Sequence, residues 1–318
     1  MHRRQLLAMT PALALGAVSL SLIPASARAQ AAPAQFRAVQ RYSLGDWTVT
    51  ALGDGYLPLD PSVLLGITPE EAQAHLRAAH QDPARMYGAV NAYVLETGSE
   101  LILIDTGSGA TFGPTLGRLA DNLREAGHDP AQVTRILCTH LHPDHIGGCA
   151  LDGGNPFPRA EFLVSAPDHA FFTSDTVRAS APEPLRPFFD LAGQVLTGFG
   201  ERVSLFQPGA DVAPGITSVA LPGHTPGHCG FLLDSGAGSL LIWGDLVHLP
   251  AIQFARPEVG LTFDTDPAQA AATRAQTLDR AATDGVMVAG MHLLFPGFGY
   301  VERAASGYRF APAPWDYV

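Results

Sequence analysis

The sequence predicts an α/β protein in which two β-sheets pack face to face and helices cover both outer surfaces, an αββα sandwich. Two runs of short apolar stretches, separated by Gly, Pro and Asp turns, each end in a segment with helical spacing. No linker separates the runs, so their sheets are expected to share one core. We therefore expect one domain that spans residues 42–318.

The first run supplies the first half of the expected sandwich. Strands are expected at residues 42–59, with a turn at Gly53-Asp54-Gly55, and at residues 89–95, 101–104, 133–138 and 161–165. Helices are expected at residues 116–126, which Gly127 ends, and from Pro167 to Phe172. Residues 173–196 are rich in Pro and Phe without a clear period, and we interpret them as a lid or pocket wall.

The second run repeats this pattern. Strands are expected at residues 203–206, 216–221, 230–233 and 240–243. Asp266-Pro267 opens a helix that reaches about residue 282, because Asp is a favoured N-cap and Pro suits the first helical position. Residues 286–289 are expected to form the final buried strand.

The N-terminus has the order of a signal peptide. Arg3 and Arg4 precede an apolar run at residues 6–23, and Ala27-Arg28-Ala29 supplies the small residues of a cleavage site. We expect residues 1–29 to be removed and residues 30–41 to form a linker. The mature protein would then be periplasmic or secreted, by the general or the twin-arginine route, and would have no membrane anchor.

The charge balance excludes some functions. The formal net charge is −11, and loss of Arg3, Arg4 and Arg28 with the leader makes it −14. An acidic protein of this kind is not expected to bind nucleic acid, because phosphate binding needs a basic surface. The sequence contains no lysine, which excludes Schiff-base chemistry.

The three cysteines, Cys138, Cys149 and Cys229, have no zinc-finger or CxxC spacing. Their odd number leaves at least one thiol unpaired within the chain. Buried free thiols are the expectation, and a local disulfide is the alternative in an oxidising compartment.

A dense group of histidines follows the expected strand at residues 133–138. The stretch His140-Leu141-His142-Pro143-Asp144-His145 holds three histidines and an aspartate within six positions. Such residues cannot all serve an apolar core, and on a turn their side chains can point toward two centres. Gly147-Gly148 then lets the chain turn away. The pattern predicts a metal site at the carboxyl end of a strand, where open α/β sheets commonly place their sites.

This motif resembles the His-x-His-x-Asp-His signature of the metallo-β-lactamase superfamily. Four further segments match motifs of that family in the same order along the chain. They are Leu-Ile-Asp-Thr-Gly at residues 103–107, Gly-His-Thr-Pro-Gly-His at 223–228, Trp-Gly-Asp at 243–245 and Gly-Met-His at 290–292.

The resemblance implies two divalent metal ions per chain. Their ligands would be His140, His142 and His224 for one ion and Asp144, His145 and His292 for the other, with Asp245 bridging the two. Imidazole and carboxylate favour zinc and also suit manganese, cobalt or iron. A hydroxide between two such ions, with its pKa lowered to about 7, would be the nucleophile. Asp144 and Asp245 are the candidates for moving a proton to the leaving group.

Two further residues of these motifs have a supporting role. Asp105 either orients a metal ligand or caps its own turn. His228 lies four positions after His224, and a structural role is expected because the ligand set is complete without it.

Other segments resemble methyl parathion hydrolase and its exported relatives. They are Gly45-Asp46-Trp47, residues 253–258 and 263–266, Phe295-Pro296-Gly297 and Gly307-Tyr308-Arg309. This resemblance implies hydrolysis of phosphotriesters, aryl esters or lactones, and suggests a homodimer.

Aromatic residues near the motifs predict an apolar pocket for a small uncharged ester or lactone. The candidates for its lining are Phe112, Phe171, Phe172, Phe188, Phe189, Phe263 and Phe298, with His248 three positions after Asp245. Core packing is the alternative role for each phenylalanine, and a core or surface position is the alternative for His248.

Other functions stay open at this stage. They are a quorum-quenching-type lactonase with no phosphotriesterase activity, a glyoxalase II-type thioesterase, and a non-catalytic metal-binding protein or an iron-dependent oxidoreductase of the same fold. Asp245 argues against a true β-lactamase, which generally lacks the bridging aspartate. The scarcity of arginine around the motifs argues against the thioesterase, whose cofactor needs a basic cluster.

Overall fold

The computed structural model describes residues 38–151 and 153–314. The expected signal segment, residues 1–29, and the first part of the expected linker lie outside these residues. Within the described ranges, the helices are too short or too polar to span a lipid bilayer.

One seven-stranded sheet takes most of the first half of the chain. In spatial order its strands are β1 (Val39–Leu44), β2 (Trp47–Pro58), β4 (Tyr87–Glu96), β5 (Leu101–Ile104), β6 (Arg135–Leu137), β7 (Glu161–Ser165) and β8 (Val203–Phe206). Neighbours from β1 to β5 are antiparallel, and those from β5 to β8 are parallel. Three helices pack on one face, namely α2 (Leu119–Glu125), α4 (Ala166–Phe172) and α6 (Arg186–Phe199).

The second seven-stranded sheet comes from the second half. In spatial order its strands are β16 (Tyr308–Pro312), β15 (Gly299–Arg303), β14 (Met287–Ala289), β12 (Ser239–Ile242), β11 (Cys229–Asp234), β10 (Ile216–Ala220) and β9 (Asp211–Ala213). Only β12 and β14 pair parallel among these described strands. The helix α8 (Pro267–Asp284) covers this sheet, with Leu278 and Ala281 packed on Trp243 and Val288.

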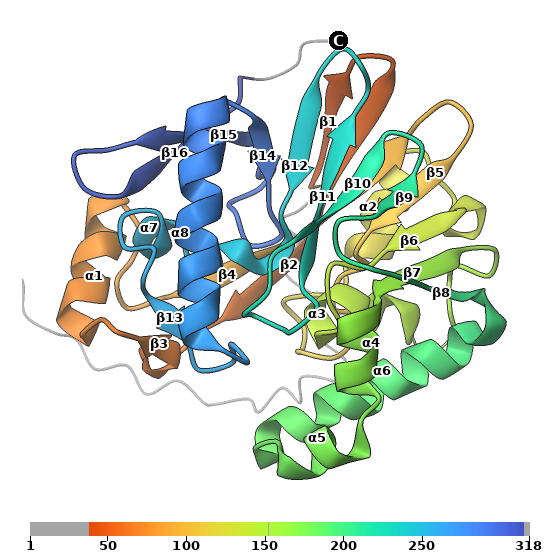
Figure 1. The fold of residues 1–318 in the computed structure, drawn as a ribbon, viewed down its shortest axis with the longest axis horizontal. Coiled ribbons are helices and arrows are strands. Elements are labelled where there is room, and N and C mark those ends of the chain that lie inside the picture. The colour runs from red at the N-terminus through yellow and green to blue at the C-terminus, as the bar shows by residue number, and fades with distance from the viewer. Residues whose placement is uncertain (1–37, 152, 315–318) are drawn as a thin grey trace, which may run out of the picture. The chain divides into compact units, whose positions relative to one another are not determined.

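The two sheets bury a common core between them. Val49, Tyr93 and Leu95 of the first sheet pack with Phe231 and Leu233 of the second. With α4 and α6 on one side and α8 on the other, the layers run helix, sheet, sheet, helix (Figure 1). The predicted αββα sandwich is therefore confirmed.

Small elements between the sheets and the solvent were not expected from the sequence. The strand β3 (Leu64–Leu65) pairs with β13 (Gly260–Leu261), and α1 (Pro69–Ala78) and α7 (Pro250–Gln253) pack beside them. Thr68 and Glu71 form a capping box at the start of α1. A capping box can be recognised in a sequence, where it predicts the start of a helix.

The expected turn at Gly53-Asp54-Gly55 is wrong. These residues form a bulge inside β2, and the chain turns instead at Gly45 and Asp46 between β1 and β2. The carboxylate of Asp54 is completely buried and accepts three backbone N–H groups from residues 108–119. The bulge points this side chain inward, and its bonds hold the loop that follows β5.

Other boundaries also differ from the expectation. Residues 173–196 are not irregular, because they contain α5 (Asp175–Ser180) and most of α6. The helix expected at residues 116–126 is shorter and consists of α2 alone. Residues 39–41, expected to belong to the linker, are part of β1. The strand β14 is not the last, because β15 and β16 extend the sheet beyond it.

The expectation for the cysteines agrees with the structure, in which Cys138, Cys149 and Cys229 are all buried and unpaired.

Candidate metal centre

The dense histidine motif lies at the carboxyl end of β6, as expected. Pro143 begins the short helix α3 (Pro143–Ile146), and Gly147 and Gly148 follow it directly. A Cβ atom at Gly147 would lie 2.1 Å from the carbonyl oxygen of Ser108, and one at Gly148 would lie 2.0 Å from that of Thr106. Only glycine permits this contact, which holds the histidine loop against the loop after β5.

The first ligand group comes from three loops. His142 Nδ1 lies 2.9 Å from His224 Nε2, which lies 3.2 Å from His140 Nε2. Asp245 Oδ2 is 3.2 Å from the same nitrogen of His224 and 3.6 Å from His140 Nε2. Four buried side chains thus direct one nitrogen or oxygen each at a common point.

The second ligand group shares Asp245. His145 Nε2 lies 3.1 Å from Asp245 Oδ1 and 3.6 Å from Asp144 Oδ2. His292 Nε2 lies 3.1 Å from Asp245 Oδ2 and 3.5 Å from Asp144 Oδ2. Because Asp245 belongs to both groups, its carboxylate lies between two adjacent sites. All seven residues named from the motifs therefore converge in space.

Burial lowers the pKa values of the ligand histidines and the neighbouring carboxylates raise them, so that the pKa of His224 rises to about 9 and those of His145 and His292 also rise. Burial, followed by the neighbouring His145, holds the pKa of His140 well below its usual value. Burial does the same for the pKa of His142. Both rings are therefore neutral at pH 7, the form that binds a metal ion. Burial opposes a charge on Asp245, but the surrounding imidazoles, His145 first, outweigh it and hold the pKa of Asp245 well below its usual value.

Among the buried side-chain atoms of the described residues that lack a hydrogen-bond partner, two belong to the ligand groups. They are His145 Nε2 and Asp245 Oδ1, which face each other. A buried polar atom without a partner is costly, and a cation between these two atoms would satisfy both. The residues therefore fit two divalent metal ions bound by nitrogen and oxygen.

Asp105 supports the second group. Its carboxylate accepts from Thr139 N at 2.8 Å and from Thr139 Oγ1 at 2.7 Å, and it lies 2.7 Å from His145 Nδ1. When His145 Nδ1 donates its proton in this hydrogen bond, the other nitrogen, Nε2, is left to bind a metal ion. Asp105 has a positive φ of 59°, which aims its side chain at the histidine loop.

Asp264, for which the sequence predicted no role, supports the first ligand group. His224 Nδ1 lies 2.8 Å from Asp264 Oδ1, and the other oxygen of Asp264 accepts from Leu261 N. On the opposite side, His292 Nδ1 lies 2.6 Å from the carbonyl of Ala89. These contacts orient the rings through the nitrogen that does not face the centre.

Asp168 was also missed, and it joins the loops that carry the ligands. Its carboxylate is fully buried and accepts from Leu141 N and from Gly227 N, each at 2.9 Å. Burial raises the pKa of Asp168. This residue holds the loop with His140 next to the loop with His224.

His228 is buried beside the centre and not among the two ligand groups. Its Nδ1 lies 2.8 Å from the carbonyl that follows β10, and its Nε2 accepts from Asp245 N at 2.9 Å. Burial lowers the pKa of His228 to about 3, which keeps the ring a neutral acceptor. His228 thus fixes the backbone of Asp245.

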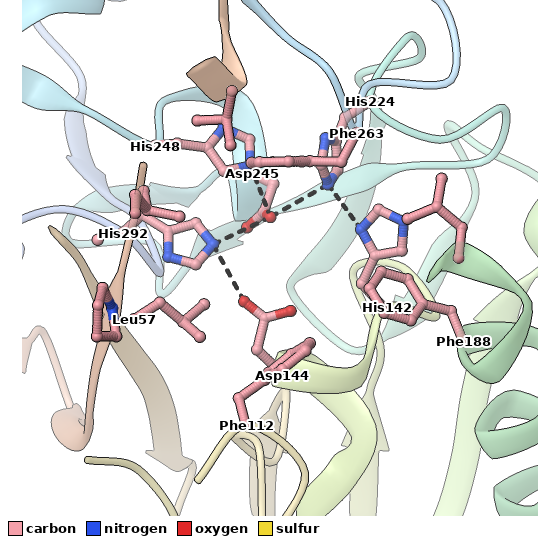
Figure 2. Close-up of a pocket in the computed structure, with 15 residues that line it drawn as sticks. Leu57, Phe112, His142, Asp144, Phe188, His224, Asp245, His248, Phe263 and His292 are labelled. Carbon is pink, nitrogen blue, oxygen red and sulfur yellow. Dashed lines mark hydrogen bonds and ion pairs between the residues drawn. The ribbon is translucent and has the colours of Figure 1, made fainter. Parts of the chain in front are cut away.

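A pocket of about 290 Å³ opens over the centre. Figure 2 shows His142 and Phe188 on one side of it and His292 and Leu57 on the other, with Asp144 and Asp245 between them. The lining outside the histidines and aspartates is entirely apolar, comprising Leu57, Pro58, Leu59, Val63, Gly88, Phe112, Leu185, Phe188 and Phe263.

The aromatic candidates divide between this pocket and the core. Phe112, Phe188, Phe263 and His248 line the pocket. The others pack in the hydrophobic cores and do not line it, namely Phe171, Phe172, Phe189 and Phe298. Phe172 still makes an edge contact with the ring of His142, at 5.7 Å between centroids. His248 Nε2 lies 3.0 Å from Asp245 Oδ2, and its ring stacks on His292.

The αββα fold and the two ligand groups define a metal-binding protein with its site at the edge of paired sheets. The sequence profile described as the Metallo-beta-lactamase superfamily matches residues 85–292, which is more than half of the chain. The chain therefore belongs to the metallo-β-lactamase superfamily, as its motifs predicted.

Solved structures and a curated relative agree with this membership. Hydrolase AbOPH, described as a member of the beta lactamase superfamily, is 31% identical with a TM-score of 0.84, over 89% of this chain and 100% of that one. AidC, a dizinc quorum-quenching lactonase solved with a homoserine product, is 26% identical with a TM-score of 0.82, over 87% of this chain and 98% of that one. A probable metallo-hydrolase of Mycobacterium bovis is 26% identical over 57% of this chain and 66% of its own length, which is just under two thirds.

Proposed function

We propose that this protein is a binuclear metal-dependent hydrolase of small, apolar, uncharged esters and lactones. The observation that carries the proposal is the position of Asp245. Its two oxygens lie between two groups of buried ligands at the floor of an apolar pocket. Two divalent cations bound there supply a water molecule of lowered pKa and polarise the oxygen of the bond under attack.

The two carboxylates have different surroundings and so different roles. Asp245 is almost fully buried, and five imidazoles lie within 3.6 Å of its oxygens. Asp144 lines the pocket, and 11% of its side chain is exposed there. We assign to Asp245 the bridging of the two sites and to Asp144 the transfer of a proton to the leaving group.

The pocket lining favours a neutral substrate. No arginine is among its residues, so a charged substrate group held away from the metal ions would lose hydration without gaining an ion pair. This lining disfavours a thioesterase of the glyoxalase type, whose substrate is charged. The similarity to a dizinc lactonase supports the lactone alternative.

Phosphotriester hydrolysis is the second candidate activity. Its support is the neutral, apolar character of the lining, which suits a triester as well as a lactone.

The test combines metal analysis with three substrates. Metals are counted per chain, and hydrolysis of a lactone, an aryl acetate and methyl paraoxon is measured side by side. Two metals with lactone or ester turnover alone support a lactonase-like enzyme, and added turnover of methyl paraoxon supports the phosphotriesterase. A chain without tightly bound metal would overturn the proposal.

Asp264→Ala is expected to weaken metal binding by about 10- to 100-fold, since carboxylates that orient ligand histidines contribute about that much. The reason is the contact of Asp264 with His224 Nδ1. Competition with a chromophoric chelator measures the affinity. Asp264→Asn is the matched control, because it keeps an oxygen acceptor and should lose less. Wild-type affinity in the alanine variant would refute the orienting role.

A further inference from the structure

Gly88 is an unusual residue for its position in the fold. It lies near the start of β4, where it pairs with Leu57 of β2, and it is buried. Glycine weakens a strand because it costs backbone entropy and packs no side chain. A strand glycine therefore marks a bulge, a close backbone approach or the approach of a ligand.

The other strand glycines of the described chain have a local reason. A Cβ atom there would lie within 3.2 Å of a neighbouring atom in every case, at Gly53, Gly55, Gly230, Gly260 and Gly299. Each of these glycines therefore allows a close contact with another part of the chain.

Gly88 lies neither at a bulge nor at a close contact with another part of the chain. The nearest atoms to a Cβ there would be Leu59 Cδ1 at 3.6 Å and His292 Nδ1 at 3.8 Å, which are ordinary contacts. Its φ is not positive, and the register shift of β2 and β4 lies elsewhere, between Gly53 and Gly55. An alanine would fit at residue 88, so the remaining reason is space for a ligand.

The missing side chain opens one side of the pocket. Paired residues of antiparallel strands point to the same face, and Leu57 lines the pocket. A side chain at residue 88 would therefore enter the cavity between Leu59 and His292. We name the space bounded by Leu57, Leu59, Gly88 and His292 the Gly88 lobe; it lies on the side of His292 in Figure 2.

We propose that the Gly88 lobe receives an apolar alkyl or aryl substituent of the substrate, and that residue 88 sets the size of the substituent accepted. This inference rests on the proposed ester or lactone substrate. The scissile group lies over the metal ligands, and the lobe extends from His292 along apolar side chains only. A substituent there gains burial without leaving a polar group unpaired.

Binding of two inert probes tests the lobe separately from turnover. Acetohydroxamic and octanohydroxamic acid share one metal-binding head group and differ in chain length. Their Kd values are measured by calorimetry on the zinc-loaded wild type, Gly88→Ala and Gly88→Val, with metal content and Tm recorded for each. Gly198→Ala is the matched control, because residue 198 lies on α6 with no neighbouring atom within 4 Å.

The wild type is expected to bind the long probe more tightly than the short one. Gly88→Val should weaken the long probe at least about tenfold, since one methylene in an apolar pocket changes selectivity by about that much. The short probe should stay within about twofold, Gly88→Ala should be intermediate, and Gly198→Ala should match the wild type.

Three results would contradict the proposed role of the Gly88 lobe. They are an equal loss of affinity for both probes in Gly88→Val, no loss of affinity for either probe, and equal affinity of the wild type for both. Hydrolysis of 4-nitrophenyl acetate and octanoate is then compared in the same proteins. If the binding contrast is present and no ester or lactone is hydrolysed, the lobe stands and the proposed function fails.

Discussion

Asp245→Ala is expected to lose metal from the centre and to lower kcat/KM by on the order of 10³-fold or more. Asp245 belongs to both ligand groups, so its removal leaves each group with only three side chains. Loss of a metal that polarises the reacting oxygen costs several kcal/mol of transition-state stabilisation, and each 1.4 kcal/mol is about tenfold in rate. Elemental analysis and steady-state kinetics measure the two effects.

The fold of this variant should persist, because the contacts between the sheets do not involve Asp245. Far-UV circular dichroism checks this point. Asp121→Ala is the matched control, since the side chain of Asp121 is 83% exposed and its ion pair with Arg124 contributes little. Near-normal activity with two bound metals in Asp245→Ala would exclude the bridging role.

The resemblance of five short motifs to the metallo-β-lactamase superfamily was sufficient to find the ligands, and the motifs that carry them follow strands. His140 comes after β6, His224 after β10, Asp245 after β12 and His292 after β14. The two sheets bring the ends of these strands to one edge. Residues that come directly after a strand are therefore collected by the fold itself, without further information on loop conformation.

The supporting carboxylates could not be found in the same way. Asp168 and Asp264 contact residues that are 27 to 59 positions away in the chain. Locally, Asp168 resembles an ordinary residue in the first turn of a helix, and Asp54 resembles a turn residue between two glycines. Their function depends on long-range contacts to ligand loops, and no local pattern reports such contacts. For Asp264, the weak indication was its place in a segment that resembles exported hydrolases.

Arg274 is a similar case. It is buried in α8 and donates to the carbonyls of Leu246, Pro257 and Val259. These bonds hold the segment between Asp245 and Asp264 against the helix. In the sequence, an arginine among alanines in a helix predicts only a solvent-exposed side chain.

Residues 173–196 do form part of the pocket wall, through Leu185 and Phe188, but their helical structure was missed for a different reason. Proline at residues 182, 184 and 187 suggested an irregular segment, but Pro187 lies in the first turn of α6, where proline is compatible with a helix. The apolar spacing of Phe189, Ala192, Val195 and Phe199 is helical, and it continues past residue 196. A segment that ends at residue 196 therefore contains only part of α6, and the helical period of the apolar residues is incomplete within it.

Removal of the metals is expected to abolish hydrolysis and to lower Tm by about 10 °C. A ligand that binds only the folded state at about 1,000 times its Kd stabilises it by about 4 kcal/mol, and 1 kcal/mol shifts Tm by about 2–4 °C in a domain of this size. The buried atoms His145 Nε2 and Asp245 Oδ1 would lose the cation between them and have no hydrogen-bond partner to replace it, which adds to the loss. Dialysis against a chelator, with calorimetry and activity before and after, measures both changes.

Re-addition of zinc should restore activity and Tm together, because the ligands are held by contacts that need no metal. Asp105 and Asp264 fix His145 and His224 from behind, and Asp168 holds their loops in place. Asp245→Ala is the control, since a centre that has already lost metal should respond less to the chelator. A chain proven metal-free that kept its Tm and its activity would show that the two ligand groups hold no functional metal.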